Sequence, residues 1–167
     1  MHPPPSLVVP LGLDSCRALM AYDDEARVLI TALKNRGHRG LITEMANRLA
    51  LLVPPGGSFT VTWAPTGAAR RRQRGFDQAE LLARAVARRR SLRCQPLLRR
   101  LPGPPQAGQS RSDRRRNPGF RATGSIPSCV LLIDDVATTG ATLVAAARVL
   151  RAAGCGEVHG LVVARAR

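Results

Sequence analysis

The stretch VLLIDDVATTGATL, residues 130–143, decides the fold. It opens with four aliphatic residues, and an uninterrupted apolar run of this kind is typical of a strand buried on both faces of a parallel sheet. Two acids, Asp134 and Asp135, follow directly, in a chain that contains only 11 acidic residues. Their place at the end of a buried strand indicates a functional site.

A helix and a second strand are expected after this segment. The helix ends at Gly154 and carries its apolar residues on one face; they are Leu143, Ala146, Ala147 and Leu150. Residues 158–164, VHGLVVA, supply the next strand, which completes a βαβ unit with a right-handed crossover. Another strand-to-helix step begins at residues 59–65, FTVTWAP. We therefore predict an open α/β sheet with its site at the carboxyl ends of the strands.

Helix and loop signals divide the middle of the chain. Apolar residues recur with helical spacing in residues 23–37 and 42–52. A third helix is predicted from Asp77, which can cap its N-terminus and forms a capping box with Glu80. Residues 66–75, TGAARRRQRG, are predicted to be the loop before it.

Composition divides the chain into two parts. Residues 1–21 are an N-terminal extension in which prolines separate short apolar stretches that could pair as a small hairpin. Residues 22–167 form the main domain. Within it, residues 102–119 are rich in Pro, Gly, Ser and Arg, which predicts a flexible loop. Loops of this length usually have a function such as closing over a substrate; a solvated linker is the alternative.

The composition limits which kinds of partner the chain can bind. A hydrophobic fraction of 44% excludes a mainly disordered protein, and an aromatic fraction of 3% leaves few rings for stacking on bases. The formal charge of +15 favours an anionic partner such as phosphates, nucleic acid or an acidic surface. Only Lys34 is a lysine, however, and such a bias toward arginine can also reflect the base composition of a genome.

The cysteines and the N-terminus indicate the cellular compartment of the protein. The four cysteines form no C-x-x-C pair, which predicts neither a zinc site nor a redox motif; they are Cys16, Cys94, Cys129 and Cys155. The N-terminus lacks a basic leader with an apolar core, and no apolar run is long enough to span a membrane. We expect a cytoplasmic protein that does not insert into membranes.

The turn between strand and helix, residues 138–142, favours phosphate binding. Its backbone N–H groups can point into one concavity at the start of a helix, and Gly140 lets the backbone approach a ligand closely. The segment is no Walker loop, since it has neither G-x-x-x-x-G-K nor a nearby lysine. Asp134 and Asp135 would repel the phosphate itself, but they can accept hydrogen bonds from vicinal hydroxyls or contact Mg²⁺.

Acids followed by a phosphate cradle describe a ribose 5-phosphate site. Two other interpretations stay open. The acids could form a metal pair in a phosphatase, or they could be polar residues at a strand end that cap a turn.

Residues 130–143 resemble the phosphoribosyl diphosphate (PRPP) signature of type I phosphoribosyltransferases. Within that superfamily the chain is similar to the ComF/GntX group, named for a role in competence for DNA uptake. The similarity covers the chain from about Tyr22 onward; its other segments are LITALK ending at Lys34, RGFDQAELLA at 74–83, and QAGQSRSDRRRN at 106–117 followed by Phe120. Many members carry an N-terminal zinc ribbon, and this chain has only Cys16 in that region, so no zinc is expected.

The resemblance implies a type I phosphoribosyltransferase-like fold: an open parallel sheet flanked by helices, with a small N-terminal region like a hood. It also implies roles for single residues. Asp134 and Asp135 would hold the ribose hydroxyls and contact Mg²⁺ through Mg–PRPP. The 5-phosphate would lie against Ala137, Thr138, Thr139, Gly140, Ala141 and Thr142. The diphosphate would lie near Arg74, Gly75, Gln106, Arg114 and Arg115.

Three functions are consistent with these features. The first is Mg²⁺-dependent transfer of a phosphoribosyl group from PRPP to an acceptor that the sequence does not identify, with no catalytic residue assigned. The second is DNA uptake or processing, through binding of single-stranded DNA or of competence-machinery proteins. The third is a sensor that binds PRPP without turnover. A homodimer is an open oligomeric state.

Overall fold

The computed structural model describes residues 9–33, 39–102 and 119–166. Its centre is a five-stranded parallel sheet in the order β1-β7-β6-β2-β3. In that order the strands span Ser15–Ala21, Glu157–Arg165, Cys129–Ala137, Thr60–Trp63 and Arg93–Cys94. The predicted α/β class and the predicted pairing of the strands around residues 130 and 160 are confirmed.

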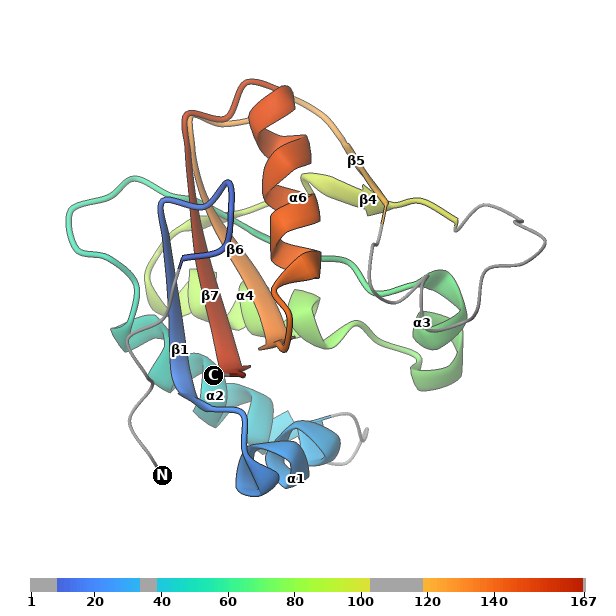
Figure 1. Ribbon diagram of the computed structural model, residues 1–167. Coiled ribbons are helices and arrows are strands. Elements are labelled where there is room, and N and C mark those ends of the chain that lie inside the picture. The colour runs from blue at the N-terminus through green and yellow to red at the C-terminus, as the bar shows by residue number, and fades with distance from the viewer. Residues whose placement is uncertain (1–8, 34–38, 103–118, 167) are drawn as a thin grey trace.

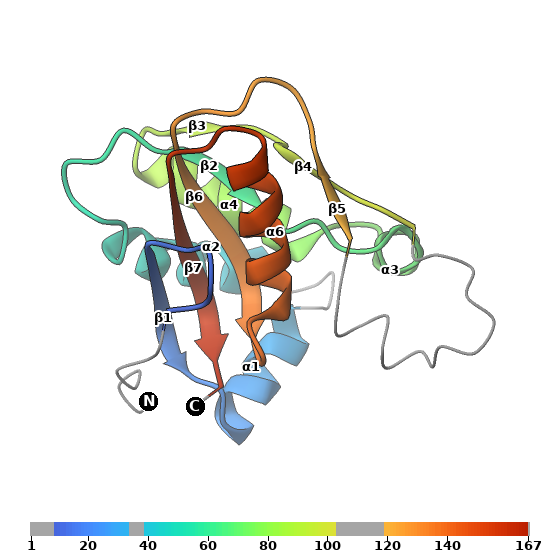
Figure 2. The same ribbon diagram turned by 45° about the horizontal axis from the view of Figure 1, so that its top comes forward.

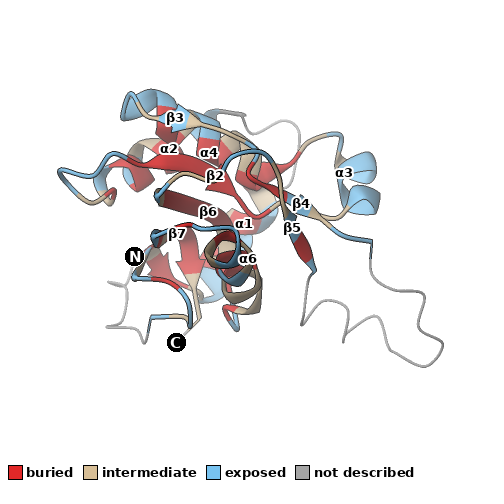
Figure 3. Cartoon of the chain, turned by 90° about the horizontal axis from the view of Figure 1, so that it is seen from above, coloured by how far each residue is buried: buried red, intermediate tan, exposed pale blue. Residues whose placement is uncertain are grey.

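Helices cover both faces of this sheet (Figures 1 and 3). On one face lie α1 (Asp24–Leu33), α2 (Arg39–Leu51) and α4 (Gln78–Arg89), which share an apolar cluster with the sheet. On the other face lies α6 (Ala141–Ala152), packed in a second cluster beside a two-stranded antiparallel ribbon. The ribbon consists of β4 (Leu98–Arg100) and β5 (Phe120–Ala122).

The aliphatic run of β6 fills both clusters. Leu131 and Ile133 belong to the cluster beneath α4, whereas Val130 and Leu132 belong to the cluster beneath α6, and each is at most 1% exposed. This alternation is what a central parallel strand requires, because side chains point to opposite faces in turn. The prediction of a strand buried on both faces is confirmed.

The connections after β2 and β6 leave the sheet on opposite faces. The chain leaves β2 toward α4, and it leaves β6 toward α6. Since β2 and β6 are neighbours, their carboxyl ends form a topological switch point, where open α/β sheets bind ligands.

β6 is longer than the sequence predicts. It pairs with β2 only as far as Ile133 but with β7 as far as Ala137. Asp134 and Asp135 therefore lie inside β6, just beyond the end of β2, and not in a turn after the strand.

No hairpin is found among residues 9–21, the described part of the predicted extension. Residues 15–21 form the edge strand β1, which pairs in parallel with β7, so Ala18 lies opposite Val162. Figure 2 shows β1, β7 and β6 side by side. The partner strand lies at the far end of the sequence, so nothing local in the chain could indicate this pairing. Residues 1–8 of the predicted extension lie outside the described residues.

Two other segments differ from the sequence prediction. The loop predicted at 66–75 contains the helix α3 (Ala68–Arg74), which ends at Gly75 in the left-handed region with φ of 78°. The ribbon of β4 and β5 was not predicted at all. Most of the predicted 102–119 loop, with Gln106, Arg114 and Arg115, lies outside the described residues. None of the helices in the described ranges is both long and apolar enough to cross a bilayer.

Candidate functional site

A polar cleft of about 180 Å³ lies at the switch point between β2 and β6. Its walls come from the ends of both strands, from α3, from the first turns of α4 and α6, and from β4. The lining residues are Ala64, Pro65, Thr66, Arg70, Arg74, Asp77, Gln78, Ala79, Arg100, Asp134, Asp135, Val136 and Thr142. Segments that are far apart in the sequence therefore meet at one site, where the sequence predicted it.

Two adjacent carboxylates form the floor of this cleft. Asp134 is 8% exposed, and its Oδ1 accepts a hydrogen bond of 2.8 Å from the backbone N–H of Asp135. Asp135 is half-buried, and its Oδ1 accepts a bond of 2.8 Å from the N–H of Val136. Burial, and then the negative charge of Asp135, raise the pKa of Asp134 well above its usual range. The pair is suited to bind a cation or hydroxyl donors that relieve this charge.

A second hollow adjoins the first at the start of α6. It is lined by residues 137–143, together with Asp134 and Val136. Gly140 has a φ of 73°, in the left-handed region, and caps the helix without a side-chain bond. Because glycine adopts this conformation without strain, the turn can direct successive N–H groups into one concavity.

Most amides of this turn are unused. The N–H of Ala141 bonds to Thr139 Oγ1 at 3.3 Å, and that of Val144 bonds to the carbonyl of Gly140. Within the described ranges, no acceptor meets five other amides, those of Thr138, Thr139, Gly140, Thr142 and Leu143. Unpaired amides at a helix N-terminus favour an anion such as phosphate.

Arginines form the opposite wall of the cleft. Arg74 donates to Gln78 Oε1 at 2.9 Å, and Arg100 donates to the carbonyl of Pro65 at 3.4 Å while lying over the Phe120 ring. Burial, and then the charge of Arg70, lower the pKa of Arg100, although guanidinium groups stay protonated at neutral pH. Cationic groups therefore face the carboxylates across the cleft.

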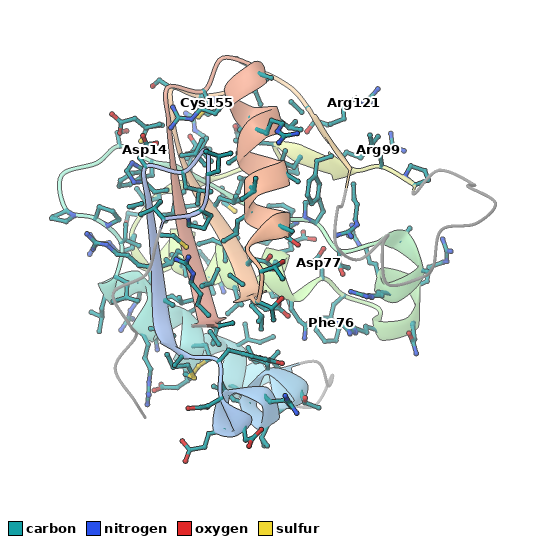
Figure 4. All side chains as sticks on the ribbon, in the orientation of Figure 1. Asp14, Phe76, Asp77, Arg99, Arg121 and Cys155 are labelled. Carbon is teal, nitrogen blue, oxygen red and sulfur yellow. The ribbon has the colours of Figure 1, made fainter. Side chains whose placement is uncertain are left out.

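Asp77 holds the chain between β2 and α4 in place. Its Oδ1 accepts from the N–H groups of Ala79 and Glu80 at 3.1 and 3.4 Å, and its Oδ2 accepts from the N–H of Thr66 at 2.7 Å. The predicted N-cap is confirmed. Burial is the main cause of the raised pKa of Asp77. This carboxylate thus fixes the position of α4 relative to the strand end, and Figure 4 labels it near the lower end of α6.

Gln78 carries a donor without a partner. The side chain is 5% exposed, and its Nε2 meets no hydrogen-bond partner in the part of the chain that the structure describes. A buried amide donor without a partner is costly, and native proteins usually satisfy such groups. Because Gln78 lines the cleft, a ligand acceptor could satisfy it.

The structure gathers most of the predicted site residues that it describes. Asp134, Asp135 and Arg74 line the cleft, and residues 137–142 line the adjoining hollow. Gly75 does not line either one: it ends α3, and its N–H bonds to the carbonyl of Arg71 at 2.7 Å. Gln106, Arg114 and Arg115 lie outside the described residues.

Among the side chains of the cleft that sequence reasoning did not assign to the site, Gln78 and Arg100 are the two with the most informative contacts. Gln78 follows the predicted N-cap, so its place in the first turn of α4 could have suggested that it faces the switch point. Arg100 lies on β4, a short strand with no periodic signal, so no sequence pattern distinguishes it from the many other arginines.

Fold and cleft together define an open parallel α/β protein with a polar site at its switch point. A scan against protein-family models finds no match for the chain, and a search of curated proteins finds none either.

Proposed function

We propose that the chain binds PRPP, or a nucleotide with a ribose 5-phosphate, together with Mg²⁺ in this cleft. One observation carries the proposal. A carboxylate pair and a turn of unpaired amides lie next to each other where β6 leads into α6. A ribose 5-phosphate carries vicinal hydroxyls and a phosphate in one small molecule, so one ligand can use both features.

The phosphate belongs at the turn. Residues 138–143 offer amides and threonine hydroxyls at the N-terminus of α6, and these donors suit an anion better than an apolar group. The ribose hydroxyls then belong at Asp134 and Asp135, which accept hydrogen bonds but donate none when ionised. The anionic phosphate and the neutral hydroxyls of the ligand are thereby directed to different parts of the site.

The donor set also fits Mg²⁺. This ion binds through one or two carboxylates and the oxygens of substrate phosphates, and Asp134 and Asp135 are the carboxylates that would contact it. When bound with PRPP, Mg²⁺ neutralises charge that develops on a diphosphate leaving group. Arg70, Arg74 and Arg100 offer further positive charge on the opposite wall.

Phosphoribosyl transfer is the reaction that this arrangement serves best. Displacement of diphosphate from ribose C1 gives the sugar positive charge and the leaving group negative charge. Arg74, Arg100 and the Nε2 of Gln78 can bind the leaving group, while the carboxylates hold the ribose. The acceptor that takes the ribosyl group is not specified by these residues.

Calorimetric titration of Mg–PRPP tests the site. We expect binding that requires Mg²⁺ and that weakens about 10- to 100-fold in Asp135→Asn, because hydrogen bonds to a charged group contribute about 1.5–3 kcal/mol. Asp24→Asn is the matched control, since that side chain is 99% exposed on α1. Equal affinities in all three proteins would exclude Asp135 as a ribose ligand.

Release of diphosphate separates a catalyst from a sensor. The protein is incubated with Mg–PRPP and a panel of purine and pyrimidine bases, and diphosphate is measured over time. Release that depends on one base identifies a transferase and its acceptor. Tight binding without release for any base supports a sensor.

Single-stranded DNA is a second candidate ligand, favoured by the β4–β5 ribbon. Arg99 and Arg121 lie directly opposite each other across its two strands, both exposed (Figure 4). Like charges in such a pair are destabilising without an anion. The affinity for a short single strand should then fall steeply with salt, with a log–log slope of about −0.7 per phosphate contacted. A flat slope would exclude binding through phosphates.

A further inference from the structure

Three potential metal ligands meet at the end of the sheet opposite the cleft. Cys129 is the first residue of β6, and it lies directly across from Glu157, the first residue of β7. His159 follows two residues later, so its side chain points to the same face of the sheet as that of Glu157. One ligand atom from each residue lies within 4.8 Å of the others. In Figure 4 this end of the sheet is marked by Asp14 and Cys155.

The separations of these atoms suit a tetrahedral metal. Cys129 Sγ lies 3.6 Å from Glu157 Oε2, and His159 Nε2 lies 3.3 Å from the same oxygen. Zinc binds sulfur at about 2.3 Å and nitrogen or oxygen at about 2.0–2.1 Å, so in a tetrahedron the S–O and N–O edges measure about 3.5 and 3.3 Å. The two edges that end on Glu157 Oε2 therefore match those of a zinc tetrahedron, and the Sγ–Nε2 edge lies within 4.8 Å.

His159 is already oriented for this role. Its Nδ1 lies 2.9 Å from Ser15 Oγ on the neighbouring strand β1, and the ring packs edge-on against Phe59 with centroids 5.3 Å apart. Histidines that bind metals usually have their second nitrogen held by a hydrogen bond, which fixes the tautomer and the ring. Here the bond at Nδ1 leaves Nε2 directed toward Glu157.

We propose that Cys129, Glu157 and His159 bind one Zn²⁺, with water in a fourth position open to solvent. A thiolate, an imidazole and a carboxylate together suit zinc better than Mg²⁺ or Ca²⁺, which prefer oxygen ligands alone. The Glu157 side chain is 63% exposed, which leaves an entry side for the ion. As the Zn–S bond forms, the Cys129 thiol releases its proton to solvent.

This site has no signature in the sequence. Zinc sites are recognised from ligands spaced a few residues apart, as in C-x-x-C, and that criterion predicted no zinc. Cys129 and Glu157 are instead brought together by strand pairing after a separation of 28 residues.

Cobalt is a suitable probe because a Co²⁺–thiolate bond absorbs light, whereas zinc is spectroscopically silent. The purified protein is stripped with chelator and titrated with Co²⁺, and then with Zn²⁺ as competitor. We expect one Co²⁺ per chain, with thiolate charge-transfer absorption that Zn²⁺ abolishes. Cys129→Ser should eliminate the absorption, and His159→Gln should weaken binding at least tenfold. Cys94→Ser, a half-buried cysteine on β3, is the matched control and should bind normally.

Thermal unfolding with and without Zn²⁺ is a second measurement, which distinguishes loss of zinc binding from poor folding of a variant. Zinc should raise the Tm of the wild type and of Cys94→Ser but not of Cys129→Ser, since a ligand stabilises only the form that binds it. No thiolate absorption in the wild type, or equal absorption in Cys129→Ser, would overturn the proposal. In that case the three side chains form only hydrogen bonds with one another.

Discussion

The two ends of the parallel sheet use their carboxylates in opposite ways. At the amino end, Asp14 Oδ2 accepts from the backbone N–H of Val158 at 2.7 Å and pairs with Arg151. At the carboxyl end, Asp134 is buried against Asp135, a second carboxylate. One acid is neutralised within the protein, whereas the other gains a like charge as its neighbour.

Opposite pKa shifts follow from this difference. Burial alone would raise the pKa of Asp14, but the bonds from Val158 and Arg151 outweigh it and lower that pKa. At Asp134, burial and the charge of Asp135 both raise the pKa. A pKa shifted so that the charged form of a group is disfavoured is typical of functional sites. The contrast shows that Asp14 is satisfied by contacts within the protein, whereas the Asp134–Asp135 pair is not and is suited to receive a ligand.

Replacing Asp77 should cause the largest loss of stability. Like Asp14 at the amino end, this acid at the carboxyl end is satisfied by hydrogen bonds within the protein. Replacement by alanine removes the cap of α4 and the bond to Thr66, which together should cost about 2–3 kcal/mol of stability. Urea unfolding measures this cost. Asp24→Ala, at an exposed position in the first turn of α1, should cost less than about 0.5 kcal/mol.

Asp77→Ala should also weaken Mg–PRPP binding, because Thr66 lines the cleft and loses its anchor. If the variant unfolds no more easily than Asp24→Ala, Asp77 is no structural acid. The division of the carboxyl end into one structural carboxylate and one ligand-binding pair would then be wrong.

An intermediate effect is expected from a matched pair of variants, Asp134→Asn and Asp14→Asn. The pKa of Asp134 is raised in the folded protein, so stability is lost as the pH rises from the unfolded pKa, about 3.9, toward the folded pKa. Asp134→Asn should therefore be more stable than the wild type at pH 7 in chelator, and the difference should vanish at low pH. Asparagine keeps an oxygen that can accept from the N–H of Asp135.

Asp14→Asn should show the reverse sign. The pKa of Asp14 is lowered on folding, so its contribution is fully present above the unfolded pKa and is lost as the pH falls through the folded value. This variant should be less stable than the wild type at pH 7 and equal to it in acid. Thermal unfolding from pH 2.5 to 8 measures both profiles. Profiles of the same sign would show that the two ends of the sheet do not differ in this way.

The sequence predicts the centre of the fold well and its edges poorly. The aliphatic run of residues 130–133 and the turn that follows are local patterns, so the βαβ unit and a cleft at the carboxyl ends of the strands could be predicted from them. The pairing of β1 with β7 joins residues about 140 positions apart, and only the folded chain reveals it. The same holds for the β4–β5 ribbon and for the approach of Cys129 to His159.

The residues of the candidate site differ in the same way in how far the sequence predicts them. The acids and the turn residues are contiguous in the sequence, so their meeting at adjoining hollows could be predicted, while phosphate binding by the turn stays a prediction. The place of Arg100 could not be predicted, since it depends on the ribbon that brings Arg100 over Pro65. Gly75, which the family resemblance places near the diphosphate, lines neither hollow and ends α3 in a left-handed conformation; its contact with a ligand stays a prediction.

Gln78 gives the smallest expected change in stability and tests the carboxyl end most directly. In Gln78→Met the unpaired Nε2 disappears while the volume of the side chain is retained. The bond from Arg74 to Oε1 is lost, but a buried donor without a partner is removed as well. The two effects oppose each other, so the free energy of unfolding should change by less than about 1 kcal/mol.

Ligand binding should respond more strongly than stability does. If Nε2 donates to PRPP, Gln78→Met should weaken Mg–PRPP binding by about tenfold, which corresponds to about 1.4 kcal/mol. Gln73→Met, at an exposed position on α3, should change neither quantity. A large loss of stability at unchanged affinity would mean that Gln78 supports the fold as Asp14 does. A binding residue can keep a donor unsatisfied in the free protein and satisfy it with the ligand, whereas a structural residue is already satisfied within the fold. Measuring both stability and affinity for Gln78→Met decides which kind of residue Gln78 is.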